Sequence, residues 1–185
     1  MATLHPFRAL RPVPERAADV ASVPYDVIDT AEARALAEGN PHSFLHVIRP
    51  EIDLPEGTDE HDDAVYERGA QNLERYAAGD DSLLEDEPSV YVYRLVMDGR
   101  AQTGIFGCVS VAEYDDDTIL KHEKTRPAKE DDRTRHIVTQ RAHAEPVMLT
   151  YRGTPALDAF VEEAMEGEPL YAFTASDGVR HELWR

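Results

Sequence analysis

The sequence predicts an α+β fold, with a mixed, mainly antiparallel sheet and flanking helices. Two apolar segments, 89–97 and 101–111, flank the dipeptide Asp98-Gly99, which is typical of a tight hairpin turn. Apolar residues recur at helical spacing in residues 60–78 and 154–166. Over 185 residues, 42% are hydrophobic and 30% are charged, which is the composition of a globular protein.

The first elements are a short strand and a capped helix. Residues 4–10 favour a strand. Asp29, with Glu32 three residues later, is the sequence signature of a helix N-cap and its capping box. We expect that helix to cover residues 30–38, because the Gly-Asn-Pro run at 39–41 ends it.

The next segment alternates between strand, loop and helix. Residues 43–48 favour a strand, and 49–59 form a loop that contains Pro and Gly. A helix over 60–78 follows, and its apolar face holds residues at helical spacing: Val65, Gly69, Leu73 and Tyr76.

The hairpin 89–111 is expected to lie at the centre of the sheet. Both faces of strand 89–97 are largely apolar, as in a strand that is covered on both sides. Cys108 has apolar neighbours, so we predict that it is buried and unreactive. As the single cysteine, it excludes an internal disulfide and a Cys-rich zinc site.

The C-terminal part is predicted to add a strand over 147–151, a helix over 154–166 and a hairpin of strands 170–174 and 179–184. The chain reads as a single α+β domain over residues 1–185. Because the sequence stops inside an apparent strand, we expect it to be the N-terminal part of a longer protein.

The charge excludes several classes of partner. The sequence has 19 Lys and Arg against 37 Asp and Glu, a net charge of -18, which repels nucleic acid and anionic membranes. It has neither a run of 18 apolar residues nor a secretory signal, so no membrane is expected and the cytoplasm is the expected location. The sequence leaves the oligomeric state open.

One basic segment interrupts this acidic chain. Residues 121–136 contain all three lysines, Lys121, Lys124 and Lys129, and have a net charge of about +2, whereas the other residues sum to -20. Lys and Arg side chains with Thr hydroxyls suit phosphate oxygens. The alternative is a solvated loop that leads into a salt-bridged helix, with Asp131 and Arg135 as an i,i+4 pair. Both interpretations stay open on composition alone.

Five segments together resemble one known family. They are Pro-Phe-Arg-Ala-Leu-Arg-Pro at 6–12, Val-Pro-Tyr-Asp-Val-Ile at 23–28, the run 40–51, Leu-Lys-His-Glu-Lys-Thr at 120–125 and Lys-Glu-Asp-Asp-Arg at 129–133. In order and spacing they resemble the family of unknown function numbered 1015 (DUF 1015), along essentially the whole chain. The resemblance implies a longer protein that carries an Asp-Gly-His-His-Arg box and is related to free-serine kinases of the ParB and sulfiredoxin-like superfamily. It also implies a fold that is in part ParB/sulfiredoxin-like.

The resemblance implies a kinase, that is, a nucleotide-dependent phosphotransferase with an alcohol group as acceptor. The acceptor would be a small hydroxylated metabolite, as in free L-serine kinases, and the cofactor ATP or ADP with Mg2+. Because this sequence lacks Asp-Gly-His-His-Arg, its activity in isolation is open. The alternative is a non-catalytic nucleotide- or protein-binding module. The charge argues against a ParB-like nucleic-acid binder, and the predicted burial of Cys108 argues against sulfiredoxin-like redox repair.

Within that hypothesis, residues are assigned by chemistry. Glu123 and His122 are the catalytic candidates, because they could move a proton beside a bound anion. The candidates for nucleotide and phosphate binding are Lys121, Lys124, Thr125, Arg126, Lys129 and Arg133. The candidates for substrate binding are Tyr25, Asp26, Arg49 and Glu51. The alternatives are a turn in which Asp26 is a local cap and a structural ion pair between Arg49 and Glu51. The metal site is undetermined, although Asp131 and Asp132 could hold Mg2+.

Overall fold

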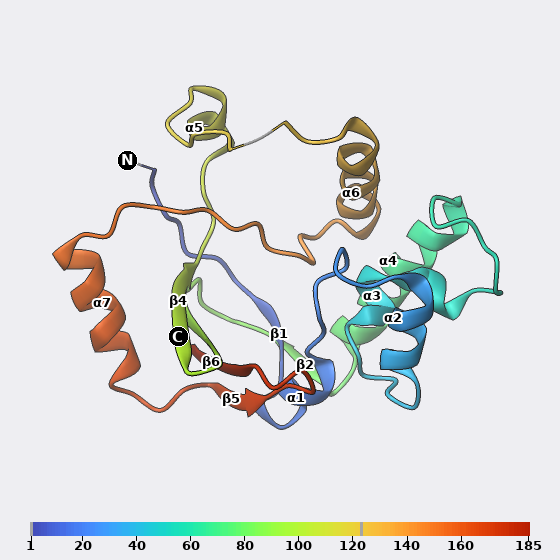
Figure 1. Ribbon diagram of the computed structural model, residues 1–185, viewed down its shortest axis with the longest axis horizontal. Helices are drawn as coiled ribbons and strands as arrows, with labels where there is room; N and C mark the ends of the chain where they lie inside the picture. The colour runs from blue at the N-terminus through green and yellow to red at the C-terminus, as the bar shows by residue number, and fades with distance from the viewer. Residues whose placement is uncertain (1, 123) are drawn as a thin grey trace. The chain divides into compact units, whose positions relative to one another are not determined.

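The computed structural model describes residues 2–122 and 124–185 (Figure 1), and its internal contacts divide the chain into two compact units. The first unit consists of Met1–Ala18, Leu84–Lys124 and Leu149–Arg185, and the second of Asp19–Leu83 and Thr125–Met148. Helices and antiparallel strands are both present, so the predicted α+β class is confirmed. A single domain over the whole chain stays a prediction.

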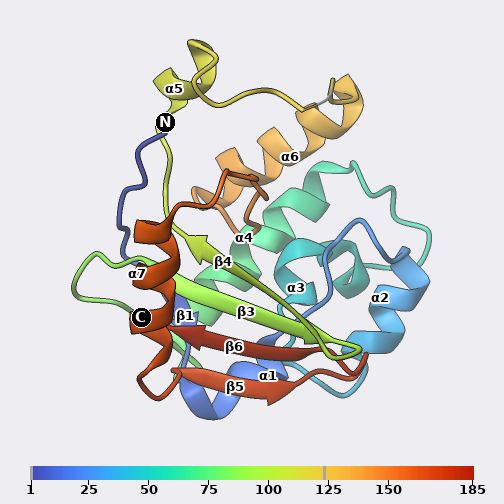
Figure 2. The same ribbon diagram turned by 60° about the vertical axis from the view of Figure 1, so that its left-hand side comes forward.

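The first unit contains a four-stranded antiparallel sheet with the order β4-β3-β6-β5 (Figure 2). The strands are β3 (Tyr91–Met97), β4 (Arg100–Phe106), β5 (Tyr171–Thr174) and β6 (Arg180–Trp184). The turn between β3 and β4 places Asp98 and Gly99 at φ 52° and 75°, the left-handed region that an Asp-Gly hairpin turn requires. Both predicted hairpins are confirmed. The central position predicted for the hairpin 89–111 holds only for β3, which β4 and β6 flank, because β4 is an edge strand.

Helix α7 (Pro155–Met165) packs against β3, and in Figure 2 it lies in front of one end of the strands. Next to this helix, the Trp184 indole donates to the backbone oxygen of Gly167 at 2.9 Å. The unit also contains β1 (Leu10–Pro12), the 3-10 helix η1 (Pro14–Arg16) and α5 (Val111–Asp115). Two short elements, α1 (Ala17–Val20) and β2 (Ser82–Leu84), lie where the chain passes from one unit to the other.

The second unit is helical. It contains α2 (Thr30–Ala37), α3 (Leu45–Ile48), the 3-10 helix η2 (Pro50–Asp53), α4 (Asp63–Ala78) and α6 (Pro127–Gln140), and α4 packs against α3, η2 and α6. Its buried apolar side chains include Ala33, Leu45, Val47, Val65 and Leu73. The capping box of α2 is confirmed, because the backbone N–H of Glu32 donates to Asp29 at 2.8 Å and that of Asp29 donates to Glu32 at 2.9 Å.

Gly69 shows why α4 can approach its neighbours closely. A Cβ atom at this position would lie 3.0 Å from Nε2 of Gln140, 3.2 Å from Cγ of Pro50 and 3.2 Å from the carbonyl oxygen of Val47. The Gln140 amide in turn donates to that carbonyl at 3.0 Å. The absent side chain therefore lets α3, η2 and α6 meet at one point of α4.

Three local predictions are wrong. The predicted strand 43–48 is instead the short helix α3, because the backbone N–H of Ser43 bonds to the oxygen of Asn40 and starts a turn that buries Leu45 and Ile48 together. A short apolar run does not distinguish a strand from a buried helix. Residues 147–151 form no strand, and Val147 and Met148 are exposed. The predicted strand 4–10 reduces to isolated bridges at His5 and Phe7, followed by β1.

The prediction that Cys108 is buried is also wrong, because its side chain is exposed. Strand β4 ends at Phe106. Beyond it, Cys108 pairs with His5 through an isolated backbone bridge. Side chains at the edge of a sheet have fewer neighbours to cover them than the side chains of a central strand. Burial of Cys108 therefore no longer counts against a sulfiredoxin-like redox role. In the part of the chain that the structure describes, no helix is long and apolar enough to cross a membrane.

Candidate functional site

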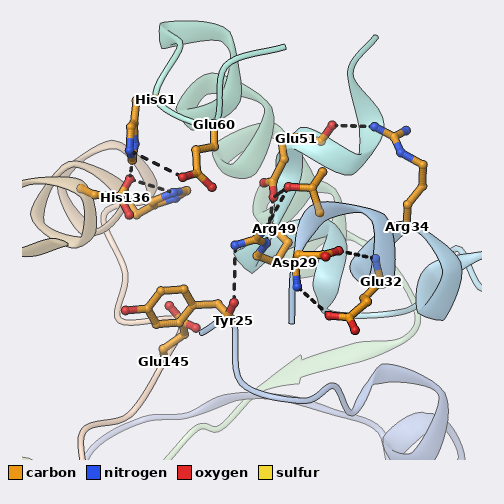
Figure 3. A network of polar contacts seen from close by, with 12 residues as sticks. Tyr25, Asp29, Glu32, Arg34, Arg49, Glu51, Glu60, His61, His136 and Glu145 are labelled. Atoms are coloured by element: carbon orange, nitrogen blue, oxygen red, sulfur yellow. Dashed lines mark hydrogen bonds and ion pairs between the residues drawn. The ribbon is translucent and has the colours of Figure 1, made fainter. Parts of the chain in front are cut away.

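The second unit contains a small charged cleft with an empty volume of about 280 Å3, part of it open to solvent. Its wall comes from the loop before α2, the junction of α3 and η2, the loop before α4, and α6. The lining residues are Tyr25, Ile48, Arg49, Glu51, Glu60, His61, Lys129, Asp132, Arg133 and His136. Figure 3 shows His61 and Glu60 on one side, Arg49 and Glu51 on another, and Tyr25 below them.

Arg49 and Glu51 form one buried charged pair of the wall. The Arg49 Nε lies 2.8 Å from a carboxylate oxygen of Glu51, and the residue Glu51 is 5% exposed. The same oxygen accepts from the Thr30 hydroxyl at 3.3 Å, and a second Arg49 nitrogen donates to that hydroxyl at 3.0 Å. A further nitrogen of Arg49 donates to the backbone oxygen of Tyr25 at 3.4 Å, so Arg49 fixes the loop before α2.

Arg133 forms the second cationic part of the wall. It donates two hydrogen bonds to one carboxylate oxygen of Asp132, at 3.0 and 2.7 Å, and one to Glu145 at 2.9 Å. Its guanidinium also lies over the ring of Tyr25, 4.0 Å from the centroid. The planar fork of Arg is suited to two carboxylates and an aromatic face at once. Burial raises the pKa of Glu145, although Arg133 opposes this shift.

Asp132 is the buried centre of the α6 side of the cleft. Its other carboxylate oxygen accepts a hydrogen bond from the Tyr66 hydroxyl at 2.8 Å. Burial by itself raises the pKa of Asp132, but the hydrogen bonds from Arg133 and Tyr66 outweigh burial and lower it overall. Burial and the hydrogen bond to Asp132 raise the pKa of Tyr66 to about 12. At neutral pH, Asp132 is therefore a carboxylate and Tyr66 a neutral donor.

His136 lies one helical turn after Asp132 and contacts Tyr66 in a tilted arrangement, with 4.7 Å between the ring centroids and 58° between the ring planes. The residue is 6% exposed, and its Nε2 lies 3.9 Å from Asp132. Burial and the positive charge of Arg133 lower its pKa to about 4, against the opposing effect of Asp132. Its Nδ1 is buried without a hydrogen-bond partner among the described residues. His136 is thus a neutral imidazole with an unused polar atom at the cleft.

The structure brings together six of the residues that the sequence singled out, although their roles stay predictions. They are Tyr25, Arg49, Glu51, Lys129, Asp132 and Arg133. Lys129 is exposed and, among residues 2–122 and 124–185, has no ion-pair partner. It is therefore the cation of the cleft with free capacity for a ligand.

The remaining predicted residues lie elsewhere. In the first unit, Lys121 donates to Asp117 at 2.6 Å and lies over the ring of Tyr114, while His122 and Lys124 are exposed. In the second unit, exposed side chains that do not line the cleft include Asp26, Thr125, Arg126 and Asp131. The Thr125 hydroxyl donates to Glu130 at 2.8 Å. Glu123, the predicted proton carrier, lies outside the described residues.

The start of α6 differs from the prediction by two residues. The sequence places it near Lys129 or Glu130, whereas the helix begins at Pro127 with Arg126 as an extended N-cap. Proline is well tolerated at the first helical position, because its missing N–H would have no partner there. One turn further, the backbone N–H of Glu130 bonds to the oxygen of Arg126.

Sequence reasoning missed three polar residues that line the cleft, Glu60, His61 and His136, and also Tyr66, which bonds to Asp132 behind the lining. One signal was readable, because Asp132 and His136 are four residues apart in a predicted helix and so share a face. His61 and Tyr66 come from a different segment, and only the packing of α4 against α6 brings them to Asp132.

The cleft offers no preformed metal cage. Among the described residues, no group of three or more His, Cys, Asp or Glu side chains could hold a metal ion. Both carboxylate oxygens of Asp132 already accept hydrogen bonds from Tyr66 and Arg133. Mg2+ usually arrives with substrate phosphates and needs only one or two carboxylates from the protein. The described residues of the cleft thus provide no metal site of their own, and any Mg2+ would have to come with the phosphates of a ligand.

The fold and the cleft define an α+β protein with a small, polar, cation-bearing pocket in a helical unit. The family model described as "Protein of unknown function (DUF1015)" matches residues 4–185, so the chain belongs to this family. No curated protein and no solved structure gives a significant match to the chain.

Proposed function

We propose that this protein is a cytoplasmic nucleotide-dependent phosphotransferase whose acceptor is a small hydroxylated metabolite, with free L-serine as the first acceptor to test. The observation that carries the proposal is the convergence of Arg49, Lys129 and Arg133 on one cleft. Guanidinium and ammonium groups are the side chains that hold transferring phosphates, and phosphoryl transfer depends mainly on such positioning and charge stabilisation. Bound Mg2+ would neutralise further charge on the phosphate oxygens.

The cleft is shallow. Its empty volume of about 280 Å3 includes open solvent, and only about 10 Å3 of it is space for the centre of a water-sized sphere. A ligand would therefore lie across the open mouth of the cleft with its charged groups against the cations of the wall, and the nucleotide base and ribose would lie outside. The choice of a small hydroxylated acceptor rests on the family resemblance of the sequence.

A charged carboxylate wall would orient the acceptor. Glu51 is held as a buried carboxylate by Arg49 and Thr30, so it is rigid and negative before any ligand binds. Such a group accepts a hydrogen bond from a hydroxyl or an ammonium without rearrangement. In this proposal, Glu51 orients the acceptor, and Lys129 and Arg133 hold the phosphate.

A turnover assay tests the proposal. The chain is mixed with Mg-ATP or Mg-ADP and a panel of small hydroxylated metabolites that includes free L-serine, and a phosphorylated acceptor is detected by 31P NMR. The proposal predicts an acceptor-dependent phosphomonoester signal. Nucleotide binding without any phosphorylated acceptor would contradict it.

One observation favours the second candidate, a non-catalytic nucleotide- or protein-binding module. Two of the three cations already have carboxylate partners, Arg49 with Glu51 and Arg133 with Asp132 and Glu145. A paired wall suits a fixed recognition surface as well as it suits catalysis. The same assay separates the two functions, because a module binds a ligand and leaves it unchanged.

A further inference from the structure

His61 is the one imidazole at the cleft that has a solvent-accessible face and a buried anchor. It precedes α4, its side chain is 51% exposed, and it lines the cleft. Its Nδ1 lies 3.3 Å from a carboxylate oxygen of Asp132, whose side chain is 7% exposed. The same Nδ1 lies 3.4 Å from the Tyr66 hydroxyl oxygen. One ring nitrogen therefore faces two oxygens that α4 and α6 hold in place.

The two oxygens around Nδ1 favour a proton on this ring nitrogen: the Tyr66 hydroxyl is within hydrogen-bond distance, and the Asp132 carboxylate is within ion-pair distance. The Tyr66 hydroxyl donates its hydrogen to Asp132, so its oxygen can only accept from Nδ1. Asp132 is also an acceptor. Both neighbours of Nδ1 thus require a hydrogen on Nδ1, which leaves the lone pair of the neutral ring on Nε2.

Nε2 is placed to act as a base. It lies 3.8 Å from a carboxylate oxygen of Glu60, which is beyond hydrogen-bond distance, so its lone pair is not occupied by Glu60. An imidazole whose far nitrogen is oriented by a buried carboxylate is a recurring device for proton abstraction from a hydroxyl.

The other candidate bases of the cleft are less suited to this task. Glu51 is engaged by Arg49 and Thr30, and Glu145 by Arg133. His136 is buried, and nearby positive charge disfavours its protonated form. Among the cleft-lining residues that the structure describes, only His61 combines an oriented ring with an accessible nitrogen.

We propose that His61 is the general base of the cleft, with Asp132 and Tyr66 as its positioning residues. This inference rests on the proposed function. The acceptor hydroxyl gives its proton to Nε2 of His61 as its oxygen bonds to the terminal phosphorus of the nucleotide. The bond from that phosphorus to the bridging oxygen breaks, and the shortened nucleotide leaves with the electron pair. The imidazolium then returns its proton to water.

A spectroscopic measurement tests the arrangement without any turnover. Long-range 1H–15N correlation spectra of the 15N-labelled full chain assign the tautomer of each neutral histidine. His61 is expected as the Nδ1–H form in the wild type and as a mixture of both forms in the double variant Tyr66→Phe, Asp132→Ala, which removes both oxygens that face Nδ1. A His61 ring that carries its proton on Nε2 in the wild type would overturn the proposal.

Kinetics test the step itself. His61→Gln is expected to lower kcat at least 100-fold and to leave the KM of the nucleotide within twofold, because a general base contributes about 10²–10⁴-fold. His143→Gln is the matched control, since His143 is exposed in the same unit and does not line the cleft. In His61→Ala, added imidazole is expected to restore part of the turnover, which a purely structural role would not allow.

The outcomes distinguish a wrong assignment of the general base from a wrong proposed function. If the wild type turns over and His61→Gln keeps its rate, His61 is not the base. If Glu123→Gln abolishes turnover while His61→Gln does not, the base is Glu123, as the sequence predicts. If the wild type phosphorylates no acceptor, the proposed function falls, and the proton-transfer step falls with it.

Discussion

Buried carboxylates occur in both units, but their surroundings differ. In the first unit, the two oxygens of Glu85 pair with Arg11 at 2.5 Å and Arg185 at 2.7 Å. Glu182 is likewise paired with Arg94 at 2.6 Å and Arg180 at 3.0 Å.

In the second unit, Asp132 has Arg133 and Tyr66 as partners, and the groups around it retain unused capacity. Among the described residues, the buried Nδ1 of His136 has no partner, and Lys129 has no ion pair. Buried polar groups in proteins are normally satisfied, so unused capacity at a cleft indicates a place for a ligand. The comparison teaches that burial of charge alone does not single out a site, whereas a cleft that combines buried carboxylates with a cation free of ion pairs among the described residues is the candidate to test.

The largest effect on stability is expected in the first unit, where each oxygen of the buried Glu85 carboxylate is paired with an arginine. Glu85→Ala leaves Arg11, whose side chain is 14% exposed, without its carboxylate, and breaking one partner of a buried ion pair costs about 3–5 kcal/mol. Urea denaturation should show that loss of unfolding free energy. Asp86→Ala, an exposed neighbour, should stay within about 0.5 kcal/mol of the wild type. Equal losses in the two variants would mean that Glu85 is not a structural centre.

A smaller loss of unfolding free energy is expected from a substitution in the second unit. Tyr66→Phe removes the hydroxyl that donates to Asp132, and loss of a hydrogen bond to a buried charged group costs about 1–3 kcal/mol. The matched control is Tyr151→Phe, because the Tyr151 side chain is exposed. Thermal or urea unfolding of both variants measures the difference. A Tyr66→Phe protein as stable as the control would show that Asp132 is satisfied without this bond.

The pH dependence of stability gives a third contrast. The pKa of His136 is lowered to about 4 from an ordinary value of 6.5, so between these values the unfolded chain binds a proton that the folded chain rejects. The contribution of His136 to stability is therefore complete above about pH 6.5 and declines as the pH falls toward 4. His136→Gln should flatten the curve of unfolding free energy against pH in this window. An unchanged slope would mean that the pKa of His136 is not lowered in the folded protein.

Local chemistry made much of the fold predictable. The Asp-Gly turn, the capping box at Asp29 and the apolar spacing of 60–78 each specify an element through contacts between neighbours in sequence, and each is confirmed. The prediction of a strand over 43–48 was wrong because the conformation of this segment depends on a turn at Asn40 and on burial against α4. No local sequence pattern contains that information. The prediction that Cys108 is buried was wrong because the exposure of its side chain depends on where the edge strand β4 ends.

The site was predictable in part for the same reason. Lys129, Asp132 and Arg133 belong to one helix, so their proximity follows from sequence spacing. Tyr25, Arg49 and Glu51 were singled out by resemblance, and the structure places them on the same cleft. His61 reaches Asp132 from 71 positions earlier in the sequence, through the packing of α4 on α6. A single sequence carries no signal for that meeting.

The most direct test of the cleft as a phosphate site is the affinity of Mg-ATP and Mg-ADP for Lys129→Ala, measured by titration calorimetry on the full chain. Removing one charged hydrogen bond should weaken nucleotide binding by about 1.5–3 kcal/mol, and the melting temperature should stay unchanged because Lys129 supports no other described residue. Arg152→Ala, an exposed cation of the first unit, should bind nucleotide as the wild type does. The double variant Lys124→Ala, Arg126→Ala measures how much the exposed basic segment adds. Wild-type affinity in Lys129→Ala would contradict a phosphate site in this cleft.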